Sequence, residues 1–187
     1  MVVAMESDRL PMRYEPGSRR PGTAEEARAL AHPLRIRILR LALDTPRTNR
    51  ELAELLDVNP GTTLHHVRTL VDHEFLVAAD VRRGKRGSRE VPYRATGKSW
   101  ILDFSEQDID RGEQGSAIIT ASHAEYAAAA PQDRFGEMRI ALRLSPDERQ
   151  ELMDRLYATV NEFHDTRQTP DGEPIALFWA FHHRRDA

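Results

Sequence analysis

The chain contains no cysteine among its 187 residues. It can therefore form no disulfide, build no thiolate metal site and use no cysteine nucleophile, which excludes several classes of sensor and enzyme together. It also lacks long apolar runs. No stretch approaches the length of a membrane span, and residues 1–22 contain no apolar segment of the kind that a signal peptide needs. We therefore expect a cytoplasmic protein.

The sequence also lacks the short motifs of common enzyme classes. It has no Gly-x-Ser-x-Gly nucleophile elbow, no P-loop and no dinucleotide-binding glycine pattern. No pair of carboxylates has a spacing that suggests a two-acid mechanism. We therefore expect a protein that binds rather than catalyses and that needs no cofactor.

Eight histidines invite the hypothesis of a zinc or nickel site. The candidate ligands in the back half are His123, His164, His182 and His183. Their spacing does not support this hypothesis, because adjacent histidines on a strand point to opposite faces and no His-x3-His pair exists. We expect ordinary surface or core histidines and no metal site.

The charge is unevenly distributed along the chain. Residues 1–100 carry 18 Lys and Arg against 13 Asp and Glu, whereas residues 101–187 carry 9 against 17. The net charge of −3 therefore hides a basic front half and an acidic back half. This asymmetry favours a polyanion-binding front half and a different task for the back half.

The front half begins with a tail and two predicted helices. Residues 1–22 contain three prolines and are expected to be a flexible tail. Thr23 and Glu26 have the spacing of a capping box that opens a helix to about Ala31. Pro33 then starts a second helix, expected over 33–44, because proline suits the first helical turn.

Two further helices are joined by a tight turn. Thr48 and Glu51 form another capping box, and Asn59 is a good N-cap for a helix that begins at Pro60 and ends near His73. The residues of this second helix that should face inward are Leu64, Val67, Leu70 and Val71. The pair has the form of a helix-turn-helix.

A basic hairpin follows the helix pair. We expect a strand over residues 75–81, a glycine-rich turn over 82–89 and a returning strand over 91–96. Helices followed by such a hairpin predict a winged helix, and residues 48–95 are the part that would hold DNA. Either element alone would be weak evidence, because a basic turn is usually only a solvated loop.

The helix from Pro60 has short polar side chains near its N-terminus, as a helix that enters the major groove needs. The candidate base contacts are Thr62, Thr63, His65, His66 and Thr69. Of the two histidines, we expect one to contact DNA and the other to brace the helix. The candidate contacts to the DNA backbone or minor groove are Asn59, Arg68, Arg82, Arg83, Lys85, Arg86 and Arg89.

The back half has the pattern of a small α+β domain. An alanine-rich helix is expected to end near Ala130, and residues 139–144 and 175–181 are expected to be strands. Between them, Ser145 should cap a helix whose buried stripe is Leu152, Leu156, Val160 and Phe163. Aromatic residues in this half could line a ligand pocket, but we favour core packing.

Three segments resemble the helices of ArsR-type winged-helix regulators: Ala31–Leu39, Leu52–Val58 and Thr62–Leu70. The resemblance covers residues 24–96. It implies a winged helix, a homodimer on a near-palindromic operator, and base reading by the helix from Pro60. The wing is also similar to that of actinobacterial members with an extra C-terminal domain.

Two features depart from this family. Without cysteine, sensing of arsenic or cadmium through thiolates is not implied. Most members have glycine near Glu74, where a left-handed helix exit costs a glutamate about 1 kcal/mol. The turn into the wing is therefore expected to differ locally.

The expected fold is mainly α with a small β component. Residues 23–97 would form the winged helix-turn-helix domain, and residues 98–187 a dimerisation domain that could also bind a small-molecule effector. We expect a homodimeric, sequence-specific transcription regulator that represses. The alternative is a protein-binding adaptor on the same scaffold, and a steep loss of affinity with salt would distinguish DNA binding from it.

Overall fold

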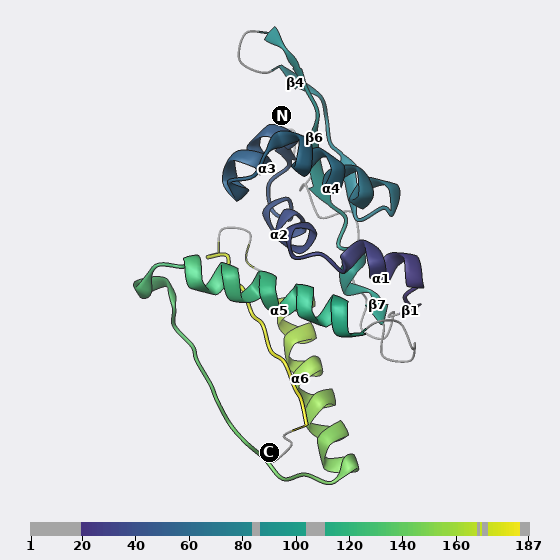
Figure 1. Cartoon of the computed structure of the whole chain (residues 1–187). Coiled ribbons are helices and arrows are strands. Elements are labelled where there is room, and N and C mark those ends of the chain that lie inside the picture. The colour runs from purple at the N-terminus through teal and green to yellow at the C-terminus, as the bar shows by residue number, and fades with distance from the viewer. Residues whose placement is uncertain (1–19, 84–86, 104–110, 168, 170–171, 184–187) are drawn as a thin grey trace, which may run out of the picture. The chain divides into compact units, whose positions relative to one another are not determined.

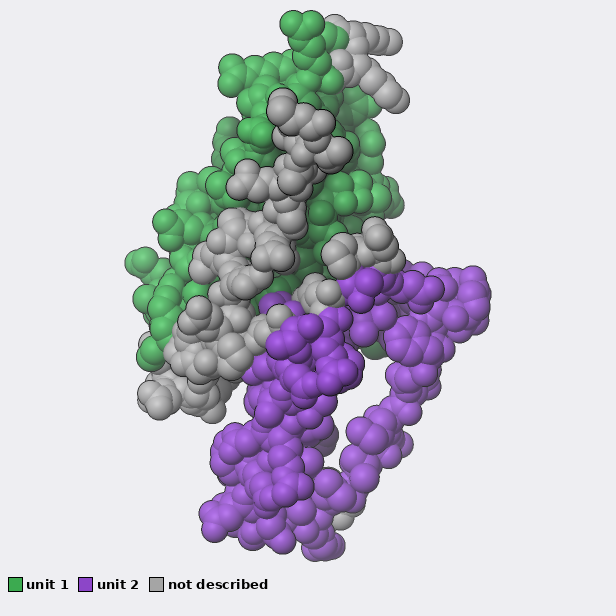
Figure 2. Space-filling model, turned by 180° about the vertical axis from the view of Figure 1, so that it is seen from behind, with its two compact units in different colours: residues 1–123 green, residues 124–187 purple. Residues whose placement is uncertain are grey.

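A computed structural model describes residues 20–83, 87–103, 111–167, 169 and 172–183. The chain divides into two compact units, residues 1–123 (unit 1) and 124–187 (unit 2), which Figure 2 shows in different colours. The expected tail lies outside the described residues up to position 19, and so do Lys85 and Arg86 of the predicted wing.

The described part of unit 1 contains four short helices between residues 24 and 72. They are α1 (Ala24–Leu30), α2 (Pro33–Leu41), α3 (Asn49–Leu56) and α4 (Pro60–Asp72). The capping boxes predicted at Thr23 and Thr48 are confirmed, as are Asn59 as the N-cap of α4 and Pro60 as its first residue. The second helix ends at Leu41, earlier than the predicted position 44.

Three strands form an antiparallel sheet in the order β2, β6, β3, and β2 lies between α2 and α3 along the chain. These strands are β2 (Arg47–Thr48), β3 (Leu76–Ala78) and β6 (Pro92–Ala95). Beyond the sheet, β4 (Arg82–Arg83) pairs with β5 (Arg89–Glu90) as a separate hairpin (Figure 1). The predicted strand over 75–81 is thus interrupted after Ala78. This arrangement is a winged helix-turn-helix.

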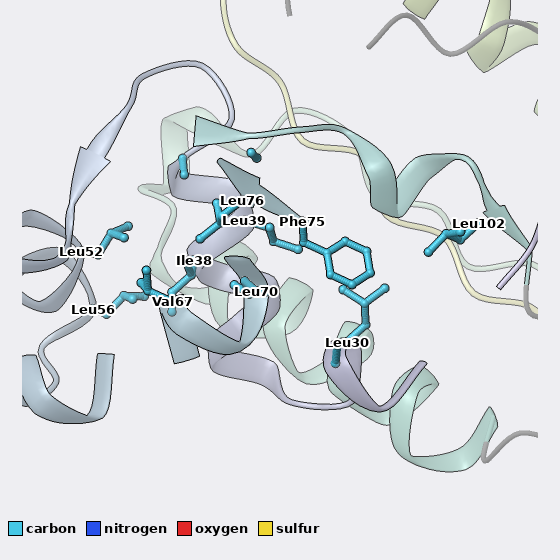
Figure 3. Close-up of a cluster of buried hydrophobic side chains, with 13 residues drawn as sticks. Leu30, Ile38, Leu39, Leu52, Leu56, Val67, Leu70, Phe75, Leu76 and Leu102 are labelled. Carbon is cyan, nitrogen blue, oxygen red and sulfur yellow. The ribbon is translucent and has the colours of Figure 1, made fainter. Parts of the chain in front are cut away.

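The core of unit 1 lies where α2, α3 and α4 meet the sheet (Figure 3). Its largest fully buried side chains are Phe75, Ile38, Leu52, Leu70, Leu76 and Val67. They come from three helices and from the segment that leads into β3. Because apolar burial contributes about 25 cal/mol per Å², this cluster is the main source of stability for the helix pair.

Unit 1 extends beyond the predicted boundaries at 23 and 97. Before α1, β1 (Arg20–Pro21) pairs in parallel with β7 (Leu102–Asp103), and Leu102 is part of the core. The carboxylate of Glu26 is buried and lies 2.5 Å from Arg20 and 3.0 Å from Lys98. These ion pairs connect both edges of the domain to α1, which is why the structure does not divide at residue 97.

The Glu26 carboxylate is therefore held in its charged form. Its hydrogen bond from Arg20 is the main cause that lowers its pKa to about 2, although burial acts in the opposite direction. The backbone N–H of Thr23 and the Lys98 ammonium lower it further. The predicted capping glutamate thus has a second role that its sequence position did not indicate.

Unit 2 is built around two helices. Helix α5 (Arg111–Ala128) crosses the division between the units, and α6 (Pro146–Thr166) begins at the predicted capping box of Ser145. The structure forms neither of the strands predicted over 139–144 and 175–181. Of the predicted buried stripe on α6, three residues are only half-buried and Phe163 is exposed, so that prediction is wrong.

The reason for this difference is physical. An alternating sequence determines which side chains share a face of a strand, but a strand also needs a neighbour for its backbone hydrogen bonds. No described segment of unit 2 supplies that neighbour.

None of the described helices combines the length and apolar character needed to cross a membrane.

Candidate nucleic-acid interface

The turn between α3 and α4 fixes the N-terminus of α4. Asp57 adopts the left-handed conformation, with φ of 54°, at the end of α3. The Asn49 side-chain amide donates to the carbonyl oxygen of Pro60 at 3.0 Å, and the Asn59 side-chain oxygen accepts from the backbone N–H of Gly61 at 2.7 Å. The first turn of α4 is therefore held in place while it remains exposed.

The outward face of α4 is polar and free of carboxylates over its first two turns. Thr62, His65 and Arg68 are exposed, as predicted from the sequence. Thr69 is half-buried, and its hydroxyl donates to the carbonyl oxygen of His65 at 3.1 Å. This face presents a hydroxyl, an imidazole and a guanidinium, which are groups that can hydrogen-bond to base edges or phosphates.

Two of the candidate base contacts do not lie on this face. Thr63 is fully buried, and its hydroxyl donates to the carbonyl oxygen of Asn59 at 3.2 Å. His66 is only 7% exposed. The expectation that both residues are on the outer surface is wrong, because α4 buries Thr63 and His66 together with Val67 and Leu70, whereas Leu64 is only half-buried.

The buried His66 ring packs against His32, which precedes α2, with ring centroids 4.4 Å apart. Burial is the main cause that lowers the pKa of His66 to about 4, and the nearby charges of His32, Arg35 and His65 lower it further. Its Nδ1 atom has no hydrogen-bond partner among the described residues. His66 is thus neutral near pH 7 and braces α4 on α2.

His32 was not a candidate in the sequence. It directly precedes Pro33, and its Nδ1 atom accepts a hydrogen bond from the backbone N–H of Leu34 at 3.1 Å and so caps α2. Burial also lowers the pKa of His32. No sequence signal could have paired it with His66, because the two residues lie on different helices.

The hairpin is attached to α3 through Arg82. Its guanidinium forms an ion pair with Glu51 and a second one with Glu90 at 3.4 Å. Burial alone would raise the pKa of Glu51, but hydrogen bonds from Thr48 and Arg82 leave that pKa lowered. The predicted phosphate contact Arg82 is therefore occupied by carboxylates and positions the hairpin relative to α3.

The other described arginines of the hairpin point into solvent. Arg83 and Arg89 face each other across β4 and β5, are exposed, and form no ion pair with any described residue. Gly87, between these strands, has φ of 80°, a conformation that glycine adopts without strain. The hairpin thus projects beyond α3 (Figure 1), and its described residues include two exposed arginines that form no ion pair.

The order of helices and strands in unit 1 has a counterpart among known families. Residues 30–77 match the family model described as a helix-turn-helix domain. This range runs from the last residue of α1 into β3, and so it includes α2, α3 and α4. No curated protein matches the chain.

Similar solved structures are remote. A cysteine-to-serine mutant of ZitR from Lactococcus lactis is 18% identical, with a TM-score of 0.31 over 70% of this chain and 73% of that chain. Wild-type ZitR in complex with DNA is 16% identical, with a TM-score of 0.26 over 85% of each chain. The transcriptional regulator SlyA is 14% identical, with a TM-score of 0.27 over 75% and 79%.

Proposed function

We propose that this chain is a sequence-specific DNA-binding transcription regulator of the ArsR type that acts as a homodimer and represses its target genes. The proposal depends mainly on one observation. The exposed face of α4, with Thr62, His65 and Arg68, belongs to the same winged helix as a projecting hairpin with two available arginines. The helix-turn-helix match over residues 30–77 supports the same assignment.

Each part of this surface has a chemical task. The N-terminal turns of α4 would enter the major groove, where His65 and Thr62 can donate to or accept from base edges. Arg83 and Arg89 would contact phosphates or the minor groove beside the major groove that α4 occupies. Thr63 and His66 hold the helix in place from inside the domain and take no direct part in reading DNA.

A salt titration tests the electrostatic part of this proposal. Duplexes are first selected from a random pool, and binding is then measured by fluorescence anisotropy at several salt concentrations. The Arg83→Ala/Arg89→Ala variant should bind all duplexes more weakly and have a salt slope smaller by about one for each lost phosphate contact. The Arg155→Ala/Arg167→Ala variant removes the same charge from unit 2 and should bind like the wild type.

A failure of this experiment has a defined meaning. If the wild-type protein selects no duplex and its weak binding does not depend on salt, the winged helix is a protein-binding adaptor. If binding is strong but both double variants behave alike, the hairpin is not the phosphate contact.

Base reading is tested separately. Thr62→Ala and His65→Ala should each lower the preference for selected over random duplexes by a factor that corresponds to about 1–3 kcal/mol, with little change in non-specific binding. Thr159→Ala changes the same kind of side chain on exposed α6 and should have no effect. The selected sites should also contain two half-sites separated by about one DNA turn if the protein binds as a dimer.

A further inference from the structure

Unit 2 has no buried core among its described residues. Among the described residues between 124 and 183, no side chain is buried. Yet the unit contains two segments whose apolar side chains would be expected in a core, at residues 138–144 and 174–181. A folded domain must bury such surface against another layer, and exposed apolar patches of this kind mark interaction sites.

The first segment lies extended between two fixed points. Before it, the Arg134 guanidinium donates to the carbonyl oxygens of Ala127 and Ala129 at the end of α5, and Glu137 accepts from the Tyr126 hydroxyl. After it, Ser145 caps α6. Within 138–144, the backbone forms no hydrogen bond with any described residue.

The side chains of this first segment alternate in character. Ile140 and Leu142 are 64% and 54% exposed, Ala141 lies between them, and Arg139 and Arg143 flank them on either side. Such a pattern suits an edge strand that has one covered face and one charged face, because charges on an edge strand prevent uncontrolled pairing.

The second segment has a different pattern. Residues 174–181 are apolar on both faces. Ile175, Leu177 and Phe181 share one face and are more than half exposed, whereas Phe178 lies on the other face and is 45% exposed. Only Trp179 is partly covered, by the Tyr157 ring of α6 at 5.8 Å between centroids. Apolar residues on both faces are typical of a strand in the interior of a sheet, where other layers cover both faces.

The two segments of one chain are not neighbours. The segment 172–183 runs back along α6, since Trp179 meets Tyr157 and His183 lies 3.2 Å from Arg149. The arm that leads from α5 to α6 stands apart from it, and Figures 1 and 2 both show an opening between them within unit 2. The segments therefore cannot complete each other within this copy.

We propose that unit 2 is completed by a second copy of this chain through strand exchange: residues 138–144 of each copy pair with residues 174–181 of the other. The two central segments pair with each other at the two-fold axis. The resulting sheet has residues 138–144 of one copy at one edge, then residues 174–181 of the other copy, then residues 174–181 of the first copy, and residues 138–144 of the other copy at the second edge. Each central segment therefore has two neighbours. This sheet satisfies both sequence patterns at once.

The charges fit a second copy. Residues 124–187 carry 12 acidic against 8 basic residues, whereas segment 138–144 contains two arginines and no acid. An arginine-bearing edge that docks on an acidic unit is electrostatically favourable. The interface is also self-complementary, as a two-fold dimer requires, because each copy offers the same edge segment and the same central segment.

This inference specifies the interface of the homodimer in the proposed function, and its test needs no DNA. Because the chain has no cysteine, introduced cysteines are unique. Chains with Leu142→Cys, enlarged by a tag, are co-expressed with untagged chains with Leu177→Cys and treated with a short bis-maleimide. We expect a covalent product of mixed size. Replacing Leu142→Cys by Glu151→Cys on the exposed face of α6 should abolish it.

Sedimentation gives a second, independent measurement. Leu142→Gln should weaken dimerisation at least tenfold, because each dimer loses two buried leucines. Arg155→Gln, on α6 and outside both segments, should change it less than threefold. Unit 1 should unfold at the same temperature in both variants, which shows that the protein is still folded.

The outcomes separate the two proposals. Strand exchange is overturned if the protein is dimeric but gives no mixed product. It is also overturned if a chain with both cysteines links only to itself. Either result leaves the dimer in place. A protein that is monomeric at every concentration overturns both the exchange and the dimer. Neither result affects DNA binding by unit 1, which the salt titration measures.

Discussion

Units 1 and 2 begin their helices in the same way but differ in what those helices bury. Thr48 and Ser145 form the same kind of capping box, at the starts of α3 and α6. Helix α3 then buries Leu52 completely, whereas α6 has no buried residue among those described. Local hydrogen bonds are thus sufficient to place a helix, but a core also requires partners from distant parts of the chain.

The largest expected difference between the units comes from replacing one phenylalanine by alanine in each of them. Phe75→Ala should lower the free energy of unfolding by about 4 kcal/mol, because Phe75 is 1% exposed and its removal leaves a cavity. Phe135→Ala, at a residue that is 80% exposed, should change it by less than about 0.5 kcal/mol. Chemical denaturation followed by circular dichroism measures both. Equal effects would mean that unit 2 has an interior.

The second test uses pH. The pKa of His66 is about 4 in the folded protein, below the 6.5 of an ordinary histidine, so the unfolded chain binds the proton first as the pH falls. Stability should therefore be highest above about pH 6.5 and should fall by about 3 kcal/mol towards pH 4. The His66→Gln variant should lose most of this dependence over that interval.

The control for the pH experiment is the neighbouring histidine. His65 is exposed on the outer face of α4 and is the smallest of the causes that lower the pKa of His66, so His65→Gln should keep most of the dependence. Thermal unfolding measured at a series of pH values would distinguish the two variants. If they gave the same profile, the buried His32–His66 contact would not be the cause.

A third, smaller effect compares the capping boxes. Thr48→Ala should lower the stability of unit 1 by about 1 kcal/mol, because the backbone N–H of Glu51 loses its acceptor. Ser145→Ala removes the equivalent bond from α6 and should reduce helical signal without changing the unfolding of unit 1. A coupled change in unfolding would show that the units fold as one.

The smallest effect concerns the exit from α4. Glu74 has φ of 60°, so it adopts the left-handed conformation that favours glycine, although its departure from glycine led us to expect a local difference in this turn. Glu74→Gly should relieve that cost and raise stability by about 0.5 kcal/mol after the larger entropy of glycine in the unfolded chain is counted. Glu54→Gly, within α3, should lower it by about 1 kcal/mol.

The α4 helix shows how far the sequence could predict the interface. Its start at Asn59 and Pro60 and its end near His73 follow from hydrogen bonds within a few residues, and the structure confirms them. The rotation of α4 about its own axis does not follow from such local hydrogen bonds. An apolar pattern favours burial of Leu64, but the contact of His66 with His32 places a polar residue inside instead.

The hairpin shows the same limit of prediction from sequence for its charged residues. Its glycines and arginines predict a basic turn over 82–89, but within that range Arg82 and Arg83 pair with Glu90 and Arg89 as strands. Nothing in the sequence distinguishes Arg82, which Glu51 and Glu90 hold, from the exposed Arg83 beside it. That distinction depends on α3 and the hairpin meeting in space, 31 residues apart along the chain.

The sequence by itself determined where helices begin, the order of the helix-turn-helix and wing, and which residues alternate in unit 2, because capping bonds and side-chain periodicity act between near neighbours. Only the tertiary structure decided that Thr63 and His66 face inward, that Arg82 is a brace, and that residues 138–144 and 174–181 do not pair within one copy. Those outcomes depend on contacts between distant segments, whose geometry local preferences do not specify.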